Sequence, residues 1–279
     1  MINVHGHNFQ TDDIDSLGLL TNPVFEPNET SVLTELVQKG DTCLDIGANI
    51  GYYTSLFANL VGPAGRVLAF EPDRYNFDLL TANMEKHPNR CVVECFRLAL
   101  SDNPGFGSLF KCDVNRGMHR LYDSVCCSDE AENVEVVCGD SLCEGVVDVI
   151  KIDIEGYEFY ALRGLSSVIK RSSDIKILTE FSPLSLLEAG SSTADFARFL
   201  LELEFYPSTI NGNGELDTIY IEEFLRQCAI ADAIDLTSLT LSMKGMAVSD
   251  ISQKAQQALV SAGYTRPMLE NILWRKKSD

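Results

Sequence analysis

The chain has 279 residues, of which 45% are hydrophobic, and 22 basic residues against 41 acidic ones give it a net charge of −19. This length and apolar content predict one large α/β domain with additions, or two smaller domains, around a sizeable core. Because so negative a surface repels phosphates and anionic lipids, nucleic acids and membranes are unfavourable partners. No apolar run reaches the roughly 18 residues of a membrane span, and segment 1–15 lacks the pattern of a secretory signal. Nine cysteines without C-x-x-C spacing are typical of reduced thiols, so we expect a cytoplasmic protein.

Strand-like and helix-like apolar runs alternate along the chain from residue 28. This alternation implies parallel strands joined by helical crossovers, and therefore an open parallel sheet with helices on both faces. Ligands of such sheets bind beyond the carboxyl ends of the strands, so residues at those ends matter most for function. The patterns predict strands over 42–46, 66–70, 91–100, 146–154 and 175–181, and helices over 28–38, 50–60, 74–87, 193–203, 252–262 and 267–274, with a short helix from Tyr157.

Two segments interrupt this alternation. Residues 101–133 are polar and glycine-containing, and they are long for a connection within a compact domain, which predicts a lid or a binding loop. Residues 207–249 are also irregular, around Asn211-Gly212-Asn213-Gly214. We therefore expect an N-terminal extension with a helix over 1–40, a core over 41–210 that carries the 101–133 insert, and a C-terminal extension over 211–279.

A glycine-containing turn is the sharpest motif of the sequence. In Asp45-Ile-Gly47-Ala-Asn49-Ile-Gly51, a predicted strand is followed by a predicted helix, the context of a nucleotide-binding turn. Gly47 would permit the tight turn, and Gly51 would let the helix pack closely against the sheet. Glycines also mark ordinary strand–helix turns, but here the next strand ends in Glu71, and an acid at that place can bind both hydroxyls of a ribose. The two features together predict a nucleoside cofactor.

The charge of the turn indicates which nucleoside cofactor would bind there. Dinucleotide sites place a pyrophosphate on the helix N-terminus, whereas this turn carries Asp45 at its mouth. A carboxylate there would repel a pyrophosphate and would suit the ammonium and sulfonium groups of S-adenosylmethionine. The turn therefore favours S-adenosylmethionine over NAD or FAD.

The motifs Asp45–Thr54, Phe70–Asp73 and Ile150–Glu158, followed by Ile177–Pro183, resemble the FkbM family of S-adenosylmethionine-dependent methyltransferases over roughly residues 41–206. The resemblance implies a class I methyltransferase fold, an α/β fold whose seven-stranded, mainly parallel sheet has the order 3-2-1-4-5-7-6. It implies O-methylation of a small molecule, a sugar or a natural-product intermediate, with S-adenosylhomocysteine as the other product. It also implies that Gly47, Asn49 and Gly51 line the methionine part of the cofactor, that Asp45 faces its amino group through water, that Glu71 binds the ribose, and that Ala99 and Leu100 lie near adenine.

Asp153 and Glu155 follow the predicted strand at 146–154, where the resemblance implies that an acid lies beside the methyl group. Residues two apart in an extended chain point to the same side. The two acids could anchor the acceptor or act as a general base, which we favour. Alternatively Glu155 caps the next helix while Lys151 pairs with Asp148, or, as the third choice, the acids bind a metal with Asp140 and Glu180. We assign no metal ligand.

The long insert carries three further candidates. His119 could remove a hydroxyl proton, or be a solvated loop side chain. Arg116 and Arg120 could bind a carboxylate or phosphate of the acceptor, or form surface pairs.

Outside the insert, Tyr52 or Tyr53 could cover the cofactor or pack in the core. We assign catalysis to Asp153, Glu155 and His119; cofactor contacts to Asp45, Gly47, Asn49, Gly51, Tyr53, Glu71, Pro72, Ala99, Leu100 and Asp153; and acceptor contacts to Arg116, Arg120 and Glu180.

Three other functions stay open beside O-methylation. N-methylation on the same fold differs only in the attacking atom. A nicotinamide-dependent oxidoreductase is disfavoured by Asp45 and Asn49 in the turn, and a non-catalytic cofactor-binding protein is disfavoured by the intact Asp153-Ile-Glu155-Gly element.

Overall fold

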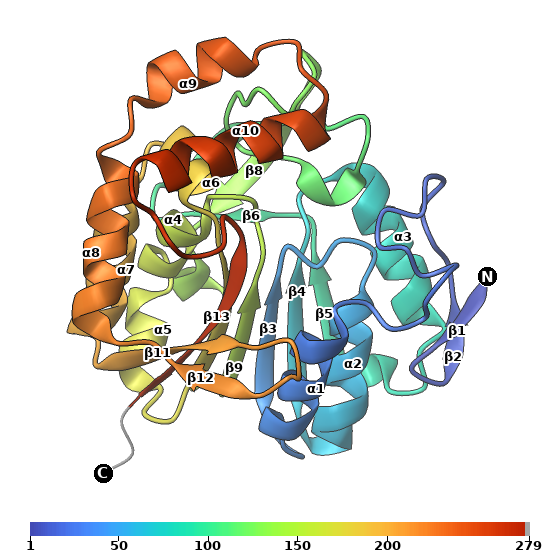
Figure 1. The fold of residues 1–279 in the computed structure, drawn as a ribbon. Coiled ribbons are helices and arrows are strands. Elements are labelled where there is room, and N and C mark those ends of the chain that lie inside the picture. Colours follow the sequence, from blue (N-terminus) through green and yellow to red (C-terminus); the bar gives the residue numbers. More distant parts are fainter. Residues whose placement is uncertain (277–279) are drawn as a thin grey trace.

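The computed structural model describes residues 1–276, and its largest sheet has eight strands in the order β12-β11-β13-β10-β9-β3-β4-β5 (Figure 1). The predicted order 3-2-1-4-5-7-6 is confirmed: β13 is the seventh strand and runs antiparallel to both of its neighbours, and β12 adds an edge strand. The chain therefore has the class I methyltransferase fold. The strands are β3 (Thr42–Ile46), β4 (Arg66–Phe70), β5 (Val93–Phe96), β9 (Val149–Ile152), β10 (Lys176–Phe181), β11 (Phe205–Ile210), β12 (Leu216–Thr218) and β13 (Glu270–Lys276).

Helices cover both faces of this sheet, as the alternation predicts (Figure 1). On one face Cys43 of β3 belongs to a core with Leu33 and Phe57, and on the other face Leu44 belongs to a core with Trp274. The first face carries α1 (Pro27–Leu36), α2 (Tyr52–Val61) and α3 (Arg74–Glu85), and the second carries α4 (Glu158–Arg163), α5 (Ser166–Arg171), α7 (Thr193–Glu202) and α8 (Ile221–Asp232).

Further elements lie beyond the carboxyl ends of the parallel strands, at the top of Figure 1. Leu184 of α6 (Pro183–Glu188) packs with Met243 of α9 (Leu236–Met243) and Ile251 of α10 (Val248–Ser261). The N-terminal hairpin of β1 (Ile2–Val4) and β2 (His7–Phe9) packs on the α2 and α3 side. Within residues 1–276, no helix combines the length and the apolar character that crossing a bilayer requires.

The predicted helix over 267–274 is wrong, because residues 270–274 belong to strand β13, an interior strand of the sheet. Leu273 is buried in the core on one face, and Ile272 and Trp274 are buried on the other. An interior strand is apolar on both faces and lacks the period of two that would identify it from sequence. The expected boundary between the core and the C-terminal extension, at residue 210, therefore falls between strands of one sheet.

The two irregular segments are more ordered than predicted. Within 101–133, β7 (Gly105–Phe110) pairs with β8 (Ala131–Val137) in a three-stranded sheet that also includes β6 (Ala99–Leu100). The predicted strand 91–100 is thus divided between two sheets, as β5 and β6. Segment 207–249 contains α8 and α9, and its Asn211–Gly214 stretch is the turn of the β11–β12 hairpin.

Candidate active site

The glycine turn after β3 is fixed by close backbone contacts. Gly47 has φ 82°, in the left-handed region that favours glycine, and a Cβ on it would lie 1.9 Å from the carbonyl oxygen of Asp153. A Cβ on Gly51 would lie 2.8 Å from Leu80 Cδ1, so Gly51 allows the start of α2 to approach α3 rather than the sheet. The turn therefore touches the end of β9 directly, and β3, which carries the turn, lies between β4 with Glu71 and β9 with Asp153.

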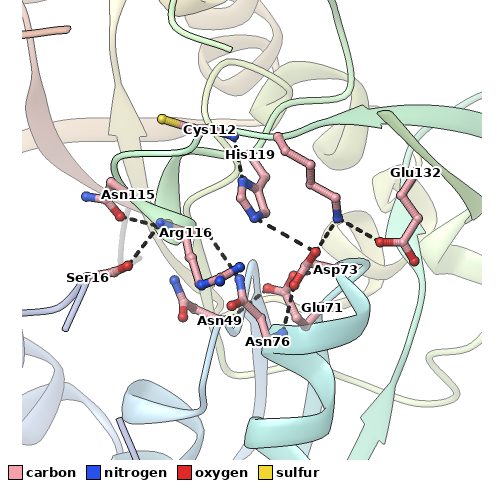
Figure 2. Close-up of polar contacts among 12 residues, drawn as sticks. Ser16, Asn49, Glu71, Asp73, Asn76, Cys112, Asn115, Arg116, His119 and Glu132 are labelled. Carbon is pink, nitrogen blue, oxygen red and sulfur yellow. Dashed lines mark hydrogen bonds and ion pairs between the residues drawn. The ribbon is translucent and has the colours of Figure 1, made fainter. Parts of the chain in front are cut away.

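Glu71 lies directly after β4 and is held by the glycine turn. Its Oε2 accepts a hydrogen bond from Asn49 N at 2.8 Å, and its Oε1 accepts one from Asp73 N at 2.9 Å (Figure 2). Burial raises the pKa of Glu71 to about 8, and the charge of Asp73 adds to this shift. A cavity of about 50 Å³ lies in front of this carboxyl group, and it brings together the predicted residues Gly47, Asn49, Glu71, Pro72, Ala99, Leu100 and Asp153.

Two residues of the cavity wall each carry a buried polar atom without a partner in the part of the chain that the structure describes. Asn76 Oδ1 and His119 Nε2 make no hydrogen bond to any residue that the structure describes. Buried polar atoms are normally paired, and an unpaired one points to a ligand or a bound water. Phe70, Leu98 and Leu109 add apolar surface to the wall. A cavity wall that combines apolar side chains, an acidic group and two polar residues has the chemistry that recognises the base and ribose of a nucleoside.

His119 lines the cavity at Glu71, and its Nε2 points toward Asp73 (Figure 2). Its Nδ1 accepts from Cys112 N at 3.0 Å, which places the proton on Nε2. Burial lowers the pKa of His119 to about 4, so the ring is neutral at pH 7 and its 3.8 Å contact with Asp73 is not an ion pair. In this tautomer Nε2 donates, and the lone pair of Nδ1 is already used. The geometry therefore fits a contact to the cofactor rather than the predicted removal of a proton.

Arg116 fastens the long insert to the rest of the molecule. Its Nε bonds Asp13 Oδ1 at 2.8 Å. Its backbone N–H donates to Ser16 Oγ at 2.9 Å, and its carbonyl accepts from Asn76 Nδ2 at 3.1 Å (Figure 2). The side chain thus forms a surface pair with Asp13, the alternative to the predicted acceptor contact. The adjacent Gly117 lies against Asn49, so that this part of the insert covers the glycine turn.

A second cavity, of about 170 Å³, adjoins the first and shares Gly47, Asn49, Gly117 and Asp153 with it. The predicted residues Tyr53, Asp153, Glu155 and Glu180 all line it. Asp153 Oδ2 accepts from Lys151 Nζ at 2.7 Å, and Glu155 Oε2 accepts from Arg120 Nη2 at 2.8 Å. Glu180 is 9% exposed, and its Oε1 has no partner among residues 1–276.

The structure also decides between the alternatives for this motif. Lys151 pairs with Asp153 and not with Asp148. Glu158, rather than Glu155, accepts the backbone hydrogen bonds of Ile154 and Gly156. Asp140 lies apart from the other acids, where its carboxylate accepts from the backbone N–H groups of Ser167 and Val168 in α5.

Arg120 and Asp45 are both buried, which the sequence did not indicate. Arg120 is 5% exposed and bonds Glu155, with Glu188 at 3.4 Å, so it anchors a carboxylate of the site instead of reaching into solvent. Asp45 is 1% exposed behind the glycine turn, where its Oδ2 accepts from Thr54 Oγ1 at 2.6 Å. Burial raises the pKa of Asp45 to about 6.

Two residues of the second cavity were missed by sequence reasoning. Glu26, at φ 41° just before α1, accepts from Tyr53 Oη at 2.7 Å and lies outside every motif. Lys151 is 3% exposed, and its ammonium lies 4.7 Å from the centre of the Tyr53 ring. A lysine inside an apolar strand is a signal that could have identified Lys151, whereas nothing local marks Glu26.

The sheet order, the glycine turn and the acid after β4 define a methyltransferase fold with a nucleoside-type cavity. The profile of the methyltransferase FkbM domain matches residues 45–207, more than half of the sequence, and the chain belongs to this family. The resemblance noted in the sequence is thereby confirmed.

Several known proteins are similar to this chain. The hexuronic acid methyltransferase AglP of Haloferax volcanii is 26% identical over 167 residues, which cover 58% of this chain and 65%, just under two thirds, of that protein. The structure of the methyltransferase FkbM of Methylobacillus flagellatus has 17% identity, a TM-score of 0.43 and coverage of 68% of this chain and 49% of that one. The O-methyltransferase of Bacillus cereus in complex with S-adenosylhomocysteine has 17% identity, a TM-score of 0.43 and coverage of 72% and 82%.

Proposed function

We propose that this protein is an S-adenosylmethionine-dependent methyltransferase that methylates a hydroxyl group of a small molecule or sugar. Membership of the FkbM family supports methyl transfer. The observation that carries the proposal is the pair of adjoining cavities, one of nucleoside type at Glu71 and one lined by carboxyl groups, which meet at Gly47 and Asp153.

The first cavity would hold the cofactor. S-adenosylmethionine, when bound, supplies a methyl carbon activated by the neighbouring sulfonium. Glu71 would accept hydrogen bonds from the ribose hydroxyls, and His119 Nε2 and Asn76 Oδ1 would gain the partners that they lack. Gly47 lies on the wall that the two cavities share, where its backbone would contact the ligand.

The second cavity would hold the acceptor. Asp153 lies on the wall that the two cavities share, so its carboxylate can accept the proton of an acceptor hydroxyl there. Lys151 and Arg120 orient Asp153 and Glu155 by direct hydrogen bonds. Much of the acceleration of methyl transfer comes from alignment of the reacting atoms, which such fixed side chains provide. The insert that covers Gly47 and Asn49 would exclude water.

Four carboxyl groups from three separate segments line the acceptor cavity, at Glu26, at Asp153 and Glu155, and at Glu180. Such a wall offers many hydrogen-bond acceptors, which is typical of a site for a molecule with several hydroxyls. AglP, the relative from Haloferax volcanii, is described as acting on a hexuronic acid, which also supports a sugar acceptor.

Calorimetry with S-adenosylhomocysteine and, separately, with NAD tests the cofactor. We expect S-adenosylhomocysteine to bind and NAD not to bind; the reverse result would favour the oxidoreductase alternative. A panel of sugars and small alcohols is then incubated with the protein and methyl-labelled S-adenosylmethionine, and the products are located by mass spectrometry and NMR. A methyl group found on nitrogen would contradict O-methylation, and cofactor binding without any transfer would favour a non-catalytic protein.

A further inference from the structure

Three carboxyl groups meet in the acceptor cavity. One oxygen each from Asp153, Glu155 and Glu180 lie within 4.8 Å of one another. Asp153 and Glu155 follow β9, and Glu180 lies on the neighbouring strand β10, so the parallel pairing of these strands brings the three together. A cluster of acids alone does not make a metal site, and the partners of each carboxyl group have to be considered.

Two of the three already have a cation on one side. Lys151 Nζ bonds Asp153 Oδ2 at 2.7 Å, and Arg120 Nη2 bonds Glu155 Oε2 at 2.8 Å. Each bond uses one carboxylate oxygen and fixes the plane of the group. Buried partners of this kind orient the ligands of metal sites in proteins.

The surroundings of Glu180 provide an observation that is independent of the clustering of the three acids. Glu180 is 9% exposed, and its Oε1 is buried without a hydrogen-bond partner within residues 1–276. A buried carboxyl oxygen without a partner is costly, and a bound cation would supply the partner that Oε1 lacks.

We propose that Asp153, Glu155 and Glu180 bind one divalent cation, of the Mg²⁺ or Mn²⁺ type, in the acceptor cavity. Hard cations of this kind prefer carboxylate oxygens and complete their coordination with water or substrate oxygens. The bound acceptor would supply one or two hydroxyls to the cation, which would fix the hydroxyl beside the shared wall at Asp153. The role in catalysis rests on the proposed function, whereas the binding of the cation does not.

The test uses the full chain, stripped with a chelator and dialysed, and titrated with Mn²⁺ in the presence of S-adenosylhomocysteine. Electron paramagnetic resonance reports free and bound Mn²⁺. We expect one Mn²⁺ per chain and a loss of affinity of about 10–100-fold or more in Glu180→Gln, the range seen when metal sites are disturbed. Because an amide has nearly the shape of a protonated carboxyl group, this variant should fold, and circular dichroism checks that it does.

Glu202→Gln is the matched control, since Glu202 is an exposed residue at the end of α7 and the same change there should leave Mn²⁺ binding unaltered. Absence of stoichiometric Mn²⁺ binding, or equal binding by Glu180→Gln, would overturn the proposal and leave Glu180 with a proton. Methyl transfer that persists at the wild-type rate in excess chelator would also overturn it while the proposed function stands. Bound Mn²⁺ without transfer to any acceptor would support the site and count against the function.

Discussion

The carboxyl group of Glu71 makes cofactor binding depend on pH. Because burial raises its pKa to about 8, Glu71 is mostly protonated at pH 7, and ribose hydroxyls donate best to the ionised form. We therefore expect the affinity for S-adenosylhomocysteine to rise about tenfold per pH unit below pH 8 and to level off above it. Glu71→Gln should remove this slope and weaken binding at pH 9 by about 1.5–3 kcal/mol. Calorimetry at several pH values measures both, and a slope that survives in the variant would assign the titration to another group.

A substitution at Asp153 should affect turnover and cofactor affinity differently. Asp153→Asn keeps the shape of the side chain and removes its charge, so it should leave the affinity for S-adenosylhomocysteine nearly unchanged and lower turnover by about 10²-fold or more. Asp174→Asn is the control, because the side chain of Asp174 is 88% exposed and pairs with Lys176 at the surface. Turnover of Asp153→Asn at the wild-type rate would make Asp153 structural.

At the level of single residues, the sequence predicted the site best where the chain itself fixes a residue's position. Glu71 and Asp153 follow directly from strand ends, and parallel pairing brings strand ends to one edge. The environment of Arg120 was not predictable, because its burial depends on Glu155 and Glu188, which come from different elements. His119 was predictable as a neighbour of the site but not in its tautomer, which depends on one hydrogen bond from Cys112.

The contact between the glycine turn and β9 has a measurable effect on stability. Gly40 and Gly47 both have positive φ, but a Cβ on Gly40 meets nothing within 4 Å, whereas one on Gly47 meets the Asp153 carbonyl at 1.9 Å. Gly40→Ala should cost only the backbone strain, about 1–2 kcal/mol. Gly47→Ala should cost about 2 kcal/mol more, because strand β9 has to move. Urea unfolding compares the two variants, and equal losses would show that the turn tolerates the contact.

The insert over the glycine turn is predicted to act as a lid. Its middle is held by the Arg116 contacts to Asp13, Ser16 and Asn76, while its ends continue the β7–β8 pair. We expect hydrogen exchange of residues 111–130 to be faster than that of β3 and β9 in the free protein, and to slow when cofactor and acceptor are both bound. Equal protection in all states would make the insert a fixed part of the structure.

Elements with a clear period were predicted well, and those that long-range packing decides were not. Strands at 42–46 and 66–70 have the bounds of β3 and β4, because each is a short apolar run between turns. Strand β13 was read as a helix, because its burial on both faces removes the alternation. The β7–β8 pair was missed, since β7 carries two glycines and is largely exposed.

For the whole molecule, the place of β13 sets an order of events in folding. This strand comes last among the described elements, yet it lies between β10 and β11 near the middle of the sheet. It also carries Trp274, the single tryptophan of the sequence, whose indole N–H donates to Thr179 Oγ1 on β10 at 3.1 Å. Tryptophan fluorescence therefore reports when the sheet closes, while far-ultraviolet circular dichroism reports the helices. Because pairing of distant segments is slow, we expect the fluorescence change in stopped-flow refolding to lag behind the dichroism change. Simultaneous changes would mean that β13 enters the sheet as the helices form. The place of β13 between β10 and β11 would then never be open to a strand of another chain.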